Sequence, residues 1–509
     1  MPPSTGAWAA TTPAERTAWL RAARRALASR LGQFADLISR DVHKPRWEAL
    51  TGDLLTLLIS MRWHEKHAPR ILAPRRVPGA GVFSLGLRAR EVRAPLGRVA
   101  IIATWNYPVQ LLGVQLVQAL IAGNDVVVKP SENAPRSQRA LLELFAQGLP
   151  PHTLTWTDAA RDAGPALLNS QRFDHIVFTG STRVGRAVAA VAADRLTPTT
   201  LELSGCDSAL VLDDADPALA ASSIWTAFAM NAGQTCMAPR RALVDRAVMP
   251  RFLAALAPLA AAAPPRTLIS HDAAREAFDL ARGAVLAGGR SLTGVLEPPQ
   301  GSTLRPIVIA DCPPRAPLVA GEHFGPVLAV IPVAGPAEML DLHRTCAKHL
   351  ATSVFTARPG RAAELAPRLN AGIVTINDAL IPAGQPGLGV VGSGESGWGV
   401  SRGAAGLLAM TRPLYITTTS TRLRMPASAG DEPSPGMTER MTATLRWMFG
   451  GSKSPALART PDQPTSDQPM TESDTAPAHE SITSHAPAPP APPAPTAAHR
   501  PPQGQHARP

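Results

Sequence analysis

Strand-like and helix-like patterns alternate along the chain between about residues 98 and 213. Short apolar runs such as "DVVVKP", "HIVFTG" and "SALVLDD" are typical of buried strands. Between them, "VQLLGVQLVQALIAG" and "STRVGRAVAAVAADRL" have apolar residues at helical spacing. This alternation predicts a parallel sheet covered by helices on both faces, so the expected fold class is α/β.

The length of 509 residues exceeds what one hydrophobic core usually holds. A second α/β series begins at "NAGQTCMAPRR" and ends near "GIVTIND", so two doubly wound α/β domains fit the length. Residues 13–70 precede them and read as helices. From residue 424 the chain is rich in Pro and Ala, with too few apolar side chains to offset the entropy of ordering. We expect residues 424–509 to be disordered.

Inside that tail, residues 438–449 have a possible apolar helical face formed by Met441, Leu445, Met448 and Phe449. This face could dock weakly on a partner or on a membrane surface, and a transient helix or a surface-packed turn is the alternative. No run of about 18 apolar residues occurs, and charged residues interrupt the amino terminus where a signal peptide would be apolar. We therefore expect no membrane span and no export signal.

The net charge of +11 would ordinarily suggest nucleic-acid binding. The basic residues are mostly arginines scattered among Ala and Pro without interleaved aromatic residues, so we expect no nucleic-acid partner. The four cysteines are too few for a disulfide framework and lack the paired spacing of a zinc site: Cys206, Cys236, Cys312 and Cys346. The sequence predicts a cytoplasmic protein without a metal site.

Three short segments carry candidate functional residues. Cys236 lies in the polar segment "NAGQTCMAPRR", where a thiol is either a nucleophile or a small buried apolar residue. Gly180 and Ser181 open a helix whose free N–H groups could face a pyrophosphate, although Gly-Ser-Thr also caps ordinary helices. Lys129 and Glu132 follow a buried strand and could contact a ribose and phosphates, with a solvated turn as the alternative.

The motifs "ATWNYP", "AGNDVVVKPSE", "FTGSTRVG", "LTPTTLELSG", "GQTCMAP" and "EHFGPV" together resemble the aldehyde dehydrogenase superfamily over about residues 10–420. "WNYP", "LTPTTLEL" and "GQTCMAP" are most similar to its class 3 branch, which includes fatty and aromatic aldehyde dehydrogenases. The resemblance implies three structural parts and a homodimer. The three parts are an NAD(P)-binding domain (1–81 and 98–204), a catalytic domain (205–395), and a β bridging or oligomerisation element (82–97 with 396–420).

The same resemblance implies the chemistry of three residues. Cys236 is similar to the family nucleophile, whose thiolate attacks the aldehyde carbon to give a thiohemiacetal and then a thioester. Asn106 matches the oxyanion-binding asparagine, joined by the backbone N–H of Cys236. Glu202 matches the base that activates water for thioester hydrolysis, and it favours an acid product over acyl transfer to coenzyme A.

Cofactor and substrate contacts follow from the resemblance as well. The cofactor would be NAD or NADP, with NAD favoured because the carboxylate of Glu132 would repel a 2′-phosphate. The implied cofactor contacts are Trp105, Lys129, Ser131, Glu132, Gly180, Ser181, Gly185, Glu322 and Phe324. Tyr107 and Val390 would line the substrate pocket, and Val390 in "GVVG" stands where the family usually has phenylalanine.

Two departures from the family pattern shape the functional expectation. In "LELSGC", Ser204 replaces a glycine and Cys206 replaces a lysine, which suggests the hypothesis that Cys206 and Cys236 form a disulfide under oxidation. The smaller Val390 predicts a wider tunnel. We expect NAD(P)-dependent oxidation of an apolar aldehyde, medium- or long-chain aliphatic or aromatic, to the acid. The alternative is a degenerate family member that acts as a scaffold or cofactor-binding partner through its tail.

Overall fold

The computed structural model describes residues 6–79, 84, 86–321, 323–380, 385–420 and 435–449. One compact unit ends at Arg422, and a second unit contains the helix α16 (Met437–Phe449). The helix predicted over 438–449 is thus present. Nearly all its side chains are exposed, including Met441 and Leu445. Apart from residues 435–437, the rest of the predicted disordered tail lies outside the described residues.

The first unit contains a six-stranded sheet with strand order β20-β7-β6-β3-β4-β5. Its strands are β3 (Arg98–Ile102), β4 (Asp125–Lys129), β5 (Leu154–Trp156), β6 (His175–Gly180), β7 (Thr199–Leu203) and β20 (Gly397–Trp398). All of them run parallel except β20. The chain leaves β3 through β4 to β5 and returns to β6 on the other side of β3. This reversal creates a topological switch point at the carboxyl ends of β3 and β6, where open α/β sheets bind ligands.

Alternating side chains of β3 separate the two faces of this sheet. Val99 and Ile101 belong to the core with the N-terminal helices, and Ala100 and Ile102 belong to the core on the opposite face. The first face is covered by α1 (Pro13–Ala28), α2 (Leu31–Val42), α4 (Thr56–Ile71), α5 (Pro108–Ile121) and α6 (Pro135–Ala146). The second face is covered by α7 (Ala163–Ser170) and α8 (Thr182–Asp194). The short helix α3 (Arg46–Glu48) and the π-helical turn η1 (Ala49–Leu55) connect α2 to α4.

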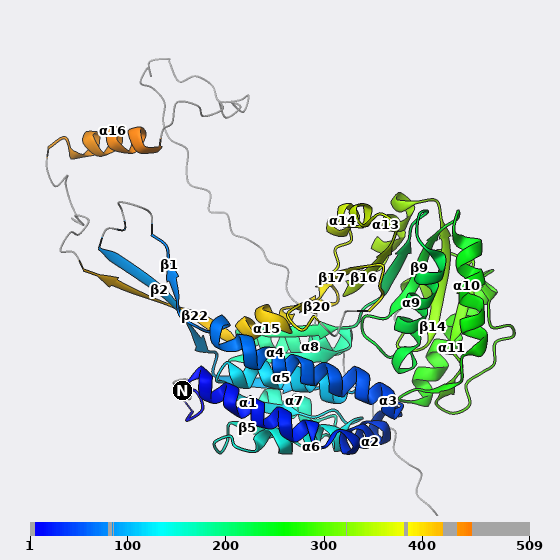
Figure 1. Ribbon diagram of the computed structural model, residues 1–509, viewed down its shortest axis with the longest axis horizontal. Coiled ribbons are helices and arrows are strands. Elements are labelled where there is room, and N and C mark those ends of the chain that lie inside the picture. Colours follow the sequence, from blue (N-terminus) through cyan, green and yellow to red (C-terminus); the bar gives the residue numbers. More distant parts are fainter. Residues whose placement is uncertain are drawn as a thin grey trace, which may run out of the picture. The chain divides into compact units, whose positions relative to one another are not determined.

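A seven-stranded sheet forms the second half of this unit, with strand order β11-β13-β14-β9-β8-β16-β17. Its strands are β8 (Asp207–Val211), β9 (Pro239–Asp245), β11 (Arg290–Ser291), β13 (Ile307–Ala310), β14 (Val327–Val333), β16 (Ala351–Phe355) and β17 (Ile373–Ile376). One face packs on α9 (Pro217–Ala229) and α10 (Met249–Ala262), and the other on α11 (His271–Leu286), α13 (Pro336–Arg344) and α14 (Pro359–Leu365). Figure 1 shows this sheet beside the first one. The predicted α/β fold with two doubly wound sheets is confirmed.

Short elements complete the first unit. They are η3 (Met230–Gly233), β10 (Arg266–Thr267), β12 (Thr303–Leu304), α12 (Pro317–Ala320), β15 (Lys348–His349), η4 (Ala366–Arg368), β18 (Val390–Val391), β19 (Ser393–Gly394), β21 (Val400–Ser401) and α15 (Gly403–Ala409).

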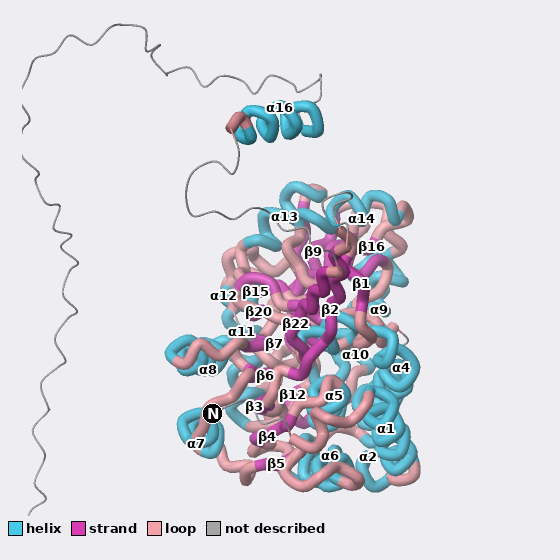
Figure 2. Tube along the Cα trace, turned by 90° about the vertical axis from the view of Figure 1, so that its left-hand side faces the viewer, coloured by secondary structure: helices cyan, strands magenta, loops and turns pink. Residues whose placement is uncertain are grey.

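A separate three-stranded antiparallel sheet contains β1 (Arg75–Val77), β2 (Leu87–Pro95) and β22 (Thr411–Thr419) (Figure 2). Its register runs from Leu87 opposite Thr419 to Pro95 opposite Thr411. This sheet differs from the expected bridging element of 82–97 with 396–420. Strand β1 lies before residue 82, and β20 pairs with β7 of the first sheet. Both strands are too short to show an apolar periodicity, so the pattern alone could not assign them.

Candidate active site

The first turn of α5 is held by a buried ion pair from the preceding helical segment. Asp53 in η1 accepts hydrogen bonds through Oδ1 from the backbone N–H groups of Val109 and Gln110, at 3.2 and 3.3 Å. Its Oδ2 lies 2.6 Å from Lys44 Nζ, and neither side chain is exposed. Lys44 Nζ also donates to the backbone oxygen of Asn106, at 2.9 Å. Asp53 therefore supplies the helix cap that the local sequence lacks, and it fixes the segment that carries Asn106.

Tyr107 joins this segment to the loop that carries Cys236. Its hydroxyl lies 2.8 Å from Thr235 Oγ1. Lys44 Nζ lies 3.7 Å from the ring centroid, which is a cation–π contact. On the other side, a Cβ atom added to Gly52 would lie 3.0 Å from the ring, so only glycine lets η1 approach so closely. Burial raises the pKa of the Tyr107 phenol, which therefore remains a neutral group at the cavity wall.

The loop before Cys236 contains three successive residues with left-handed backbone conformation. The φ angles of Asn231, Ala232 and Gly233 are 52°, 54° and 73°. Hydrogen bonds hold this strained turn: the Asn231 backbone N–H donates to Glu48 Oε2 at 2.9 Å, and Asn231 Nδ2 donates to the Asn106 backbone oxygen at 2.9 Å. The surrounding structure thus stabilises a conformation that isolated residues rarely adopt.

Arg240 binds the inner side of the same loop. Its fully buried guanidinium donates to the backbone oxygens of Gly233, Thr235 and Gly325, at 2.7, 2.9 and 3.2 Å. A Cβ atom on Gly233 would lie 2.5 Å from the backbone of Gly325, so a side chain at this position is excluded. The "EHFGPV" segment and the loop that carries Cys236 are therefore packed tightly against each other.

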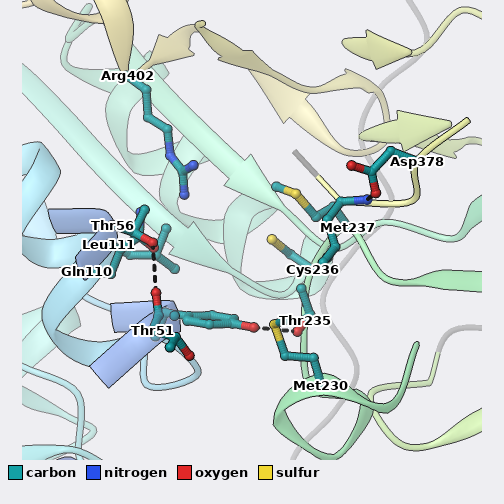
Figure 3. Close-up of a pocket in the computed structure, with 13 residues that line it drawn as sticks. Thr51, Thr56, Gln110, Leu111, Met230, Thr235, Cys236, Met237, Asp378 and Arg402 are labelled. Atoms are coloured by element: carbon teal, nitrogen blue, oxygen red, sulfur yellow. Dashed lines mark hydrogen bonds between the residues drawn. The ribbon is translucent and has the colours of Figure 1, made fainter. Parts of the chain in front are cut away.

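Cys236 is partly buried and lines a cavity of about 340 Å³ (Figure 3). The pKa of its thiol is raised to about 11, mainly by burial and then by the negative charge of Glu202, while the positive charge of Arg402 opposes both. Asn106 Nδ2 points toward the same loop and donates to the backbone oxygen of Gln234, at 3.2 Å. The predicted nucleophile and oxyanion donor are thus in one place, with the thiol mostly protonated at neutral pH.

Glu202 lies on β7 within a network of neutral hydrogen-bond donors. Thr179 Oγ1 donates to its Oε2 at 3.2 Å, and Ser401 Oγ donates to its Oε1. Gln115 hydrogen-bonds both to Thr179, at 2.8 Å, and to Glu202. Burial raises the pKa of Glu202. The carboxylate is close enough to Cys236 to affect its thiol electrostatically, but within the described contacts its hydrogen bonds go to these neutral groups.

The cavity lining combines apolar and polar side chains from both halves of the unit. It consists of Thr51, Gly52, Thr56, Tyr107, Gln110, Leu111, Met230, Thr235, Cys236, Met237, Asp378, Leu380 and Arg402. Tyr107, which the sequence predicts as a substrate-pocket residue, is part of this lining. Val390 does not belong to this lining, because it is buried in β18 opposite Ser401. Leu380 and the two methionines occupy the wall instead.

The predicted cofactor contacts gather at the carboxyl ends of β3, β4 and β6. Lys129 is buried, and its Nζ lies 3.0 Å from Glu132 Oε2. The exposed Arg161 contacts the other oxygen of Glu132 at 3.2 Å, and Ser131 is buried beside them. A lysine and a carboxylate at the topological switch point fit the ribose and phosphates of a nicotinamide dinucleotide.

The amino terminus of α8 has the features of a phosphate-binding turn and of an ordinary cap. Ser181 Oγ accepts the Val184 N–H at 3.4 Å, so the side chain caps its own helix. A Cβ atom on Gly185 would lie 2.5 Å from Leu203, which shows how closely α8 packs on β7. A Cβ atom on Gly180 would lie 2.5 Å from the ring of Phe178. A helix amino terminus after a strand is a usual place for an anion, which its backbone N–H groups and dipole favour.

Aromatic rings from the two halves meet beside this region. The ring centroids of Trp105 and Phe324 are 5.6 Å apart in an edge-to-face arrangement. Glu322 lies outside the described residues. The Cys206 thiol hydrogen-bonds to the Cys346 thiol. The disulfide hypothesis from the sequence pairs Cys206 with Cys236 instead.

Several residues that build the site carry no motif. Lys44, Asp53 and Arg402 come from segments without a recognisable pattern, and they reach the site only through tertiary packing. Arg240 follows the cysteine motif directly, and its full burial is the feature that reveals its structural role. The polar residue within the otherwise apolar strand "TTLELS" was the one local signal that did identify Glu202.

Comparisons with known proteins agree with this arrangement. A model described as "Aldehyde dehydrogenase family" matches residues 3–416. The chain is 33% identical over 426 residues to 4,4'-diapolycopene aldehyde oxidase of Methylomonas sp., covering 82% of this chain and 80% of that protein. It also resembles the crystal structure of Mycobacterium tuberculosis aldehyde dehydrogenase complexed with NAD+, with a TM-score of 0.76, 29% identity, and coverage of 81% and 87% of the two chains. An E. coli NADP dependent enzyme gives a TM-score of 0.76 at 25% identity, with coverage of 81% and 87%.

Proposed function

The chain belongs to the aldehyde dehydrogenase family, and from that premise we propose that it oxidises aldehydes with an apolar medium- or long-chain aliphatic or aromatic body. The product is the carboxylic acid. The observation that carries this proposal is the position of Cys236 on a cavity whose wall includes Leu111, Met230, Met237 and Leu380. Apolar walls of this kind bury the body of a ligand while a few polar groups orient its reactive end.

Cys236 provides the nucleophile. Its thiol gives up a proton, and the sulfur forms a bond to the aldehyde carbon as the carbonyl electron pair moves to oxygen. The thiol proton passes to solvent, and Glu202, whose raised pKa strengthens it as a proton acceptor, is the base for the later hydrolysis. A bound nicotinamide dinucleotide supplies the hydride acceptor. Water then cleaves the Cys236 thioester: Glu202 accepts a proton from the attacking water and returns it to the sulfur as the acid leaves, which restores the thiol and the carboxylate.

Asn106 stabilises the negative charge that develops on the former carbonyl oxygen. Its amide nitrogen now donates to the Gln234 backbone oxygen, so part of its donor capacity remains for the substrate. The hydrogen bonds that Lys44 and Asn231 donate to the Asn106 backbone oxygen hold this amide in position. A donor fixed before the reaction stabilises charge without reorganisation.

The preferred cofactor is NAD, because the Glu132 carboxylate would repel a 2′-phosphate. Lys129 and Arg161 already contact this carboxylate, at 3.0 and 3.2 Å. Glu132→Gln would release both cations, so we expect it to raise kcat/KM with NADP relative to NAD by about tenfold or more. An unchanged ratio of NADP to NAD efficiency would refute this assignment. Glu143→Gln, on the exposed surface of α6, is the matched control.

The assay that tests the proposed reaction is NADH formation with short aliphatic, long-chain and aromatic aldehydes. We expect Cys236→Ala to lose activity completely. Glu202→Gln should retain a first-turnover burst of NADH but hydrolyse the thioester slowly. Absence of turnover with NAD and NADP, despite binding of the cofactor, would favour the scaffold reading. Dependence of turnover on coenzyme A would favour acyl transfer.

Assembly and location are proposed on separate grounds. We propose a homodimer that pairs through β22, an edge strand with exposed Leu414 and Tyr415. The proposed membership of the class 3 branch rests on the motifs quoted above.

The four free cysteines favour a reducing cytoplasm. No helix in the described part of the chain is long and apolar enough to cross a membrane, and exposed Trp447 and Phe449 on α16 offer a weak docking face.

A further inference from the structure

The cavity beside Cys236 contains one cation that has no acceptor in the reaction described above. Arg402 lines this cavity, and Figure 3 shows its guanidinium extending into the space between Leu111 and Cys236. Within the described part of the chain, the Arg402 side chain makes no ion pair and no hydrogen bond. Its positive charge acts on Glu202 and on Cys236 only through space.

Gln110 provides a second unpaired donor in the same lining. Its side chain is 2% exposed, and its Nε2 has no hydrogen-bond partner in the described structure. A buried amide N–H without a partner is unfavourable, so such a group usually meets a ligand or a water molecule. Arg402 and Gln110 come from distant segments of the chain and still line one cavity.

The remaining polar groups of the lining already have partners. Thr51 Oγ1 donates to Trp47, and Thr56 Oγ1 donates to the Thr51 backbone oxygen. The Thr235 hydroxyl pairs with Tyr107. Asp378 Oδ1 accepts two backbone N–H groups that follow it. The Asp378 carboxylate is thus held within its own turn, whereas the Arg402 guanidinium has no hydrogen-bond partner in the described part of the chain and suits an anionic acceptor.

Glu202 does not neutralise Arg402 by direct contact, because its two oxygens accept hydrogen bonds from Thr179 and Ser401. The backbone of Arg402 is strained, with φ 62° and ψ 167°, a region that favours glycine. Strain of this kind persists where the position of a side chain serves a function. A glycine at this position would relieve the strain but would remove the guanidinium from the cavity.

We propose that the aldehyde oxidised at Cys236 carries a carboxylate or a comparable anionic group, which the Arg402 guanidinium binds with the Gln110 amide N–H beside it. This assignment rests on the proposed dehydrogenase function and narrows its substrate class to aldehydes that combine an apolar body with an acid group. Leu111 and Met237 contact the apolar body, and Arg402 orients the molecule so that the aldehyde carbon faces the thiol. Arginine suits this role because its planar fork binds both oxygens of a carboxylate.

The test compares adipic semialdehyde with its methyl ester, which has the same chain but no charge. We expect the wild type to prefer the acid, mainly through KM. Arg402→Gln should lower the acid-to-ester ratio of kcat/KM by about 10- to 100-fold, the usual effect of a charged hydrogen bond. Gln110→Leu should lower the same ratio by a smaller factor. Arg251→Gln removes a positive charge from an exposed position on α10 and should leave the ratio unchanged.

Other results would overturn the proposal. Equal efficiency of the acid and the ester in the wild type would show that no charge is recognised. An equal loss for both substrates in Arg402→Gln would mean that Arg402 acts on Cys236 or Glu202 instead. If the wild type oxidises neither compound, the proposed reaction fails by itself, and calorimetric binding of adipate decides about the anion site. Binding weakened by Arg402→Gln then supports the site, and undetectable binding overturns it.

Discussion

Replacement of Asp53 by asparagine isolates the ion pair that supports the Asn106 segment. The change keeps an oxygen that can accept the two backbone N–H groups of α5, but it removes the negative charge 2.6 Å from Lys44 Nζ. Both side chains are completely buried, so the ammonium is left without its counter-charge in a region without water access. Breaking a buried pair in this way typically costs about 3–5 kcal/mol.

The assay is urea-induced unfolding followed by tryptophan fluorescence, which the nine tryptophans make practicable. Asp36→Asn is the matched control, because its ion pair with Arg46 is also close, at 2.9 Å, but both side chains are largely exposed. An exposed pair contributes about 0–1 kcal/mol. We further expect a lower kcat for Asp53→Asn, since Lys44 also positions Asn106. A destabilisation of Asp53→Asn equal to that of Asp36→Asn would refute the reasoning.

Three further predictions concern the cysteines and their loop. Because burial raises the pKa of Cys236 to about 11, its alkylation by iodoacetamide in the cofactor-free protein should accelerate about tenfold per pH unit between about pH 7 and pH 10, and a rate that levels off below about pH 9 would contradict this. Gly233→Ala should reduce kcat by about a hundredfold or more because its Cβ would meet backbone, whereas Gly301→Ala, also at positive φ but in open space, should keep normal activity. Peroxide should link Cys206 to Cys346, whose thiols already hydrogen-bond, and peptide mapping that finds Cys206 joined to Cys236 would disprove this.

The sequence predicted those parts of the molecule that depend on local pattern. Strand β6 (His175–Gly180) coincides with the apolar run "HIVFTG", because a buried parallel strand needs only a short continuous apolar segment. Cys236 and Tyr107, two residues that the motifs predict for the site, line one cavity. Val390 was expected in the substrate pocket, but its direction depends on the pairing of a two-residue strand. No pattern in a segment of that length fixes which face a side chain takes.

The residues that sequence reasoning missed were missed for the same physical reason. Lys44 and Asp53 are polar side chains in an otherwise helical region, where a solvated face is the ordinary interpretation of charge. Only the fold reveals that they face inward, cap α5 and contact Asn106. Arg402 was missed for the same reason, since a lone arginine after a glycine-rich turn has no periodicity that could locate its guanidinium.

Strained backbone is found on two sides of the cavity, and the two places differ in how the strain is held. The left-handed turn at Asn231 is satisfied by Glu48 and Arg240, which bond its backbone from opposite sides. These bonds are internal, so the cysteine loop keeps its geometry whether or not a ligand is present. At Arg402 the backbone N–H has a partner, Gln118, but the guanidinium has none among the described residues. The first arrangement fixes a nucleophile in advance, which lowers the reorganisation needed in the reaction. The Arg402 arrangement is complete only when an acceptor enters the cavity. The binding energy at Arg402 therefore depends on the substrate, and we expect Arg402 to discriminate between substrates.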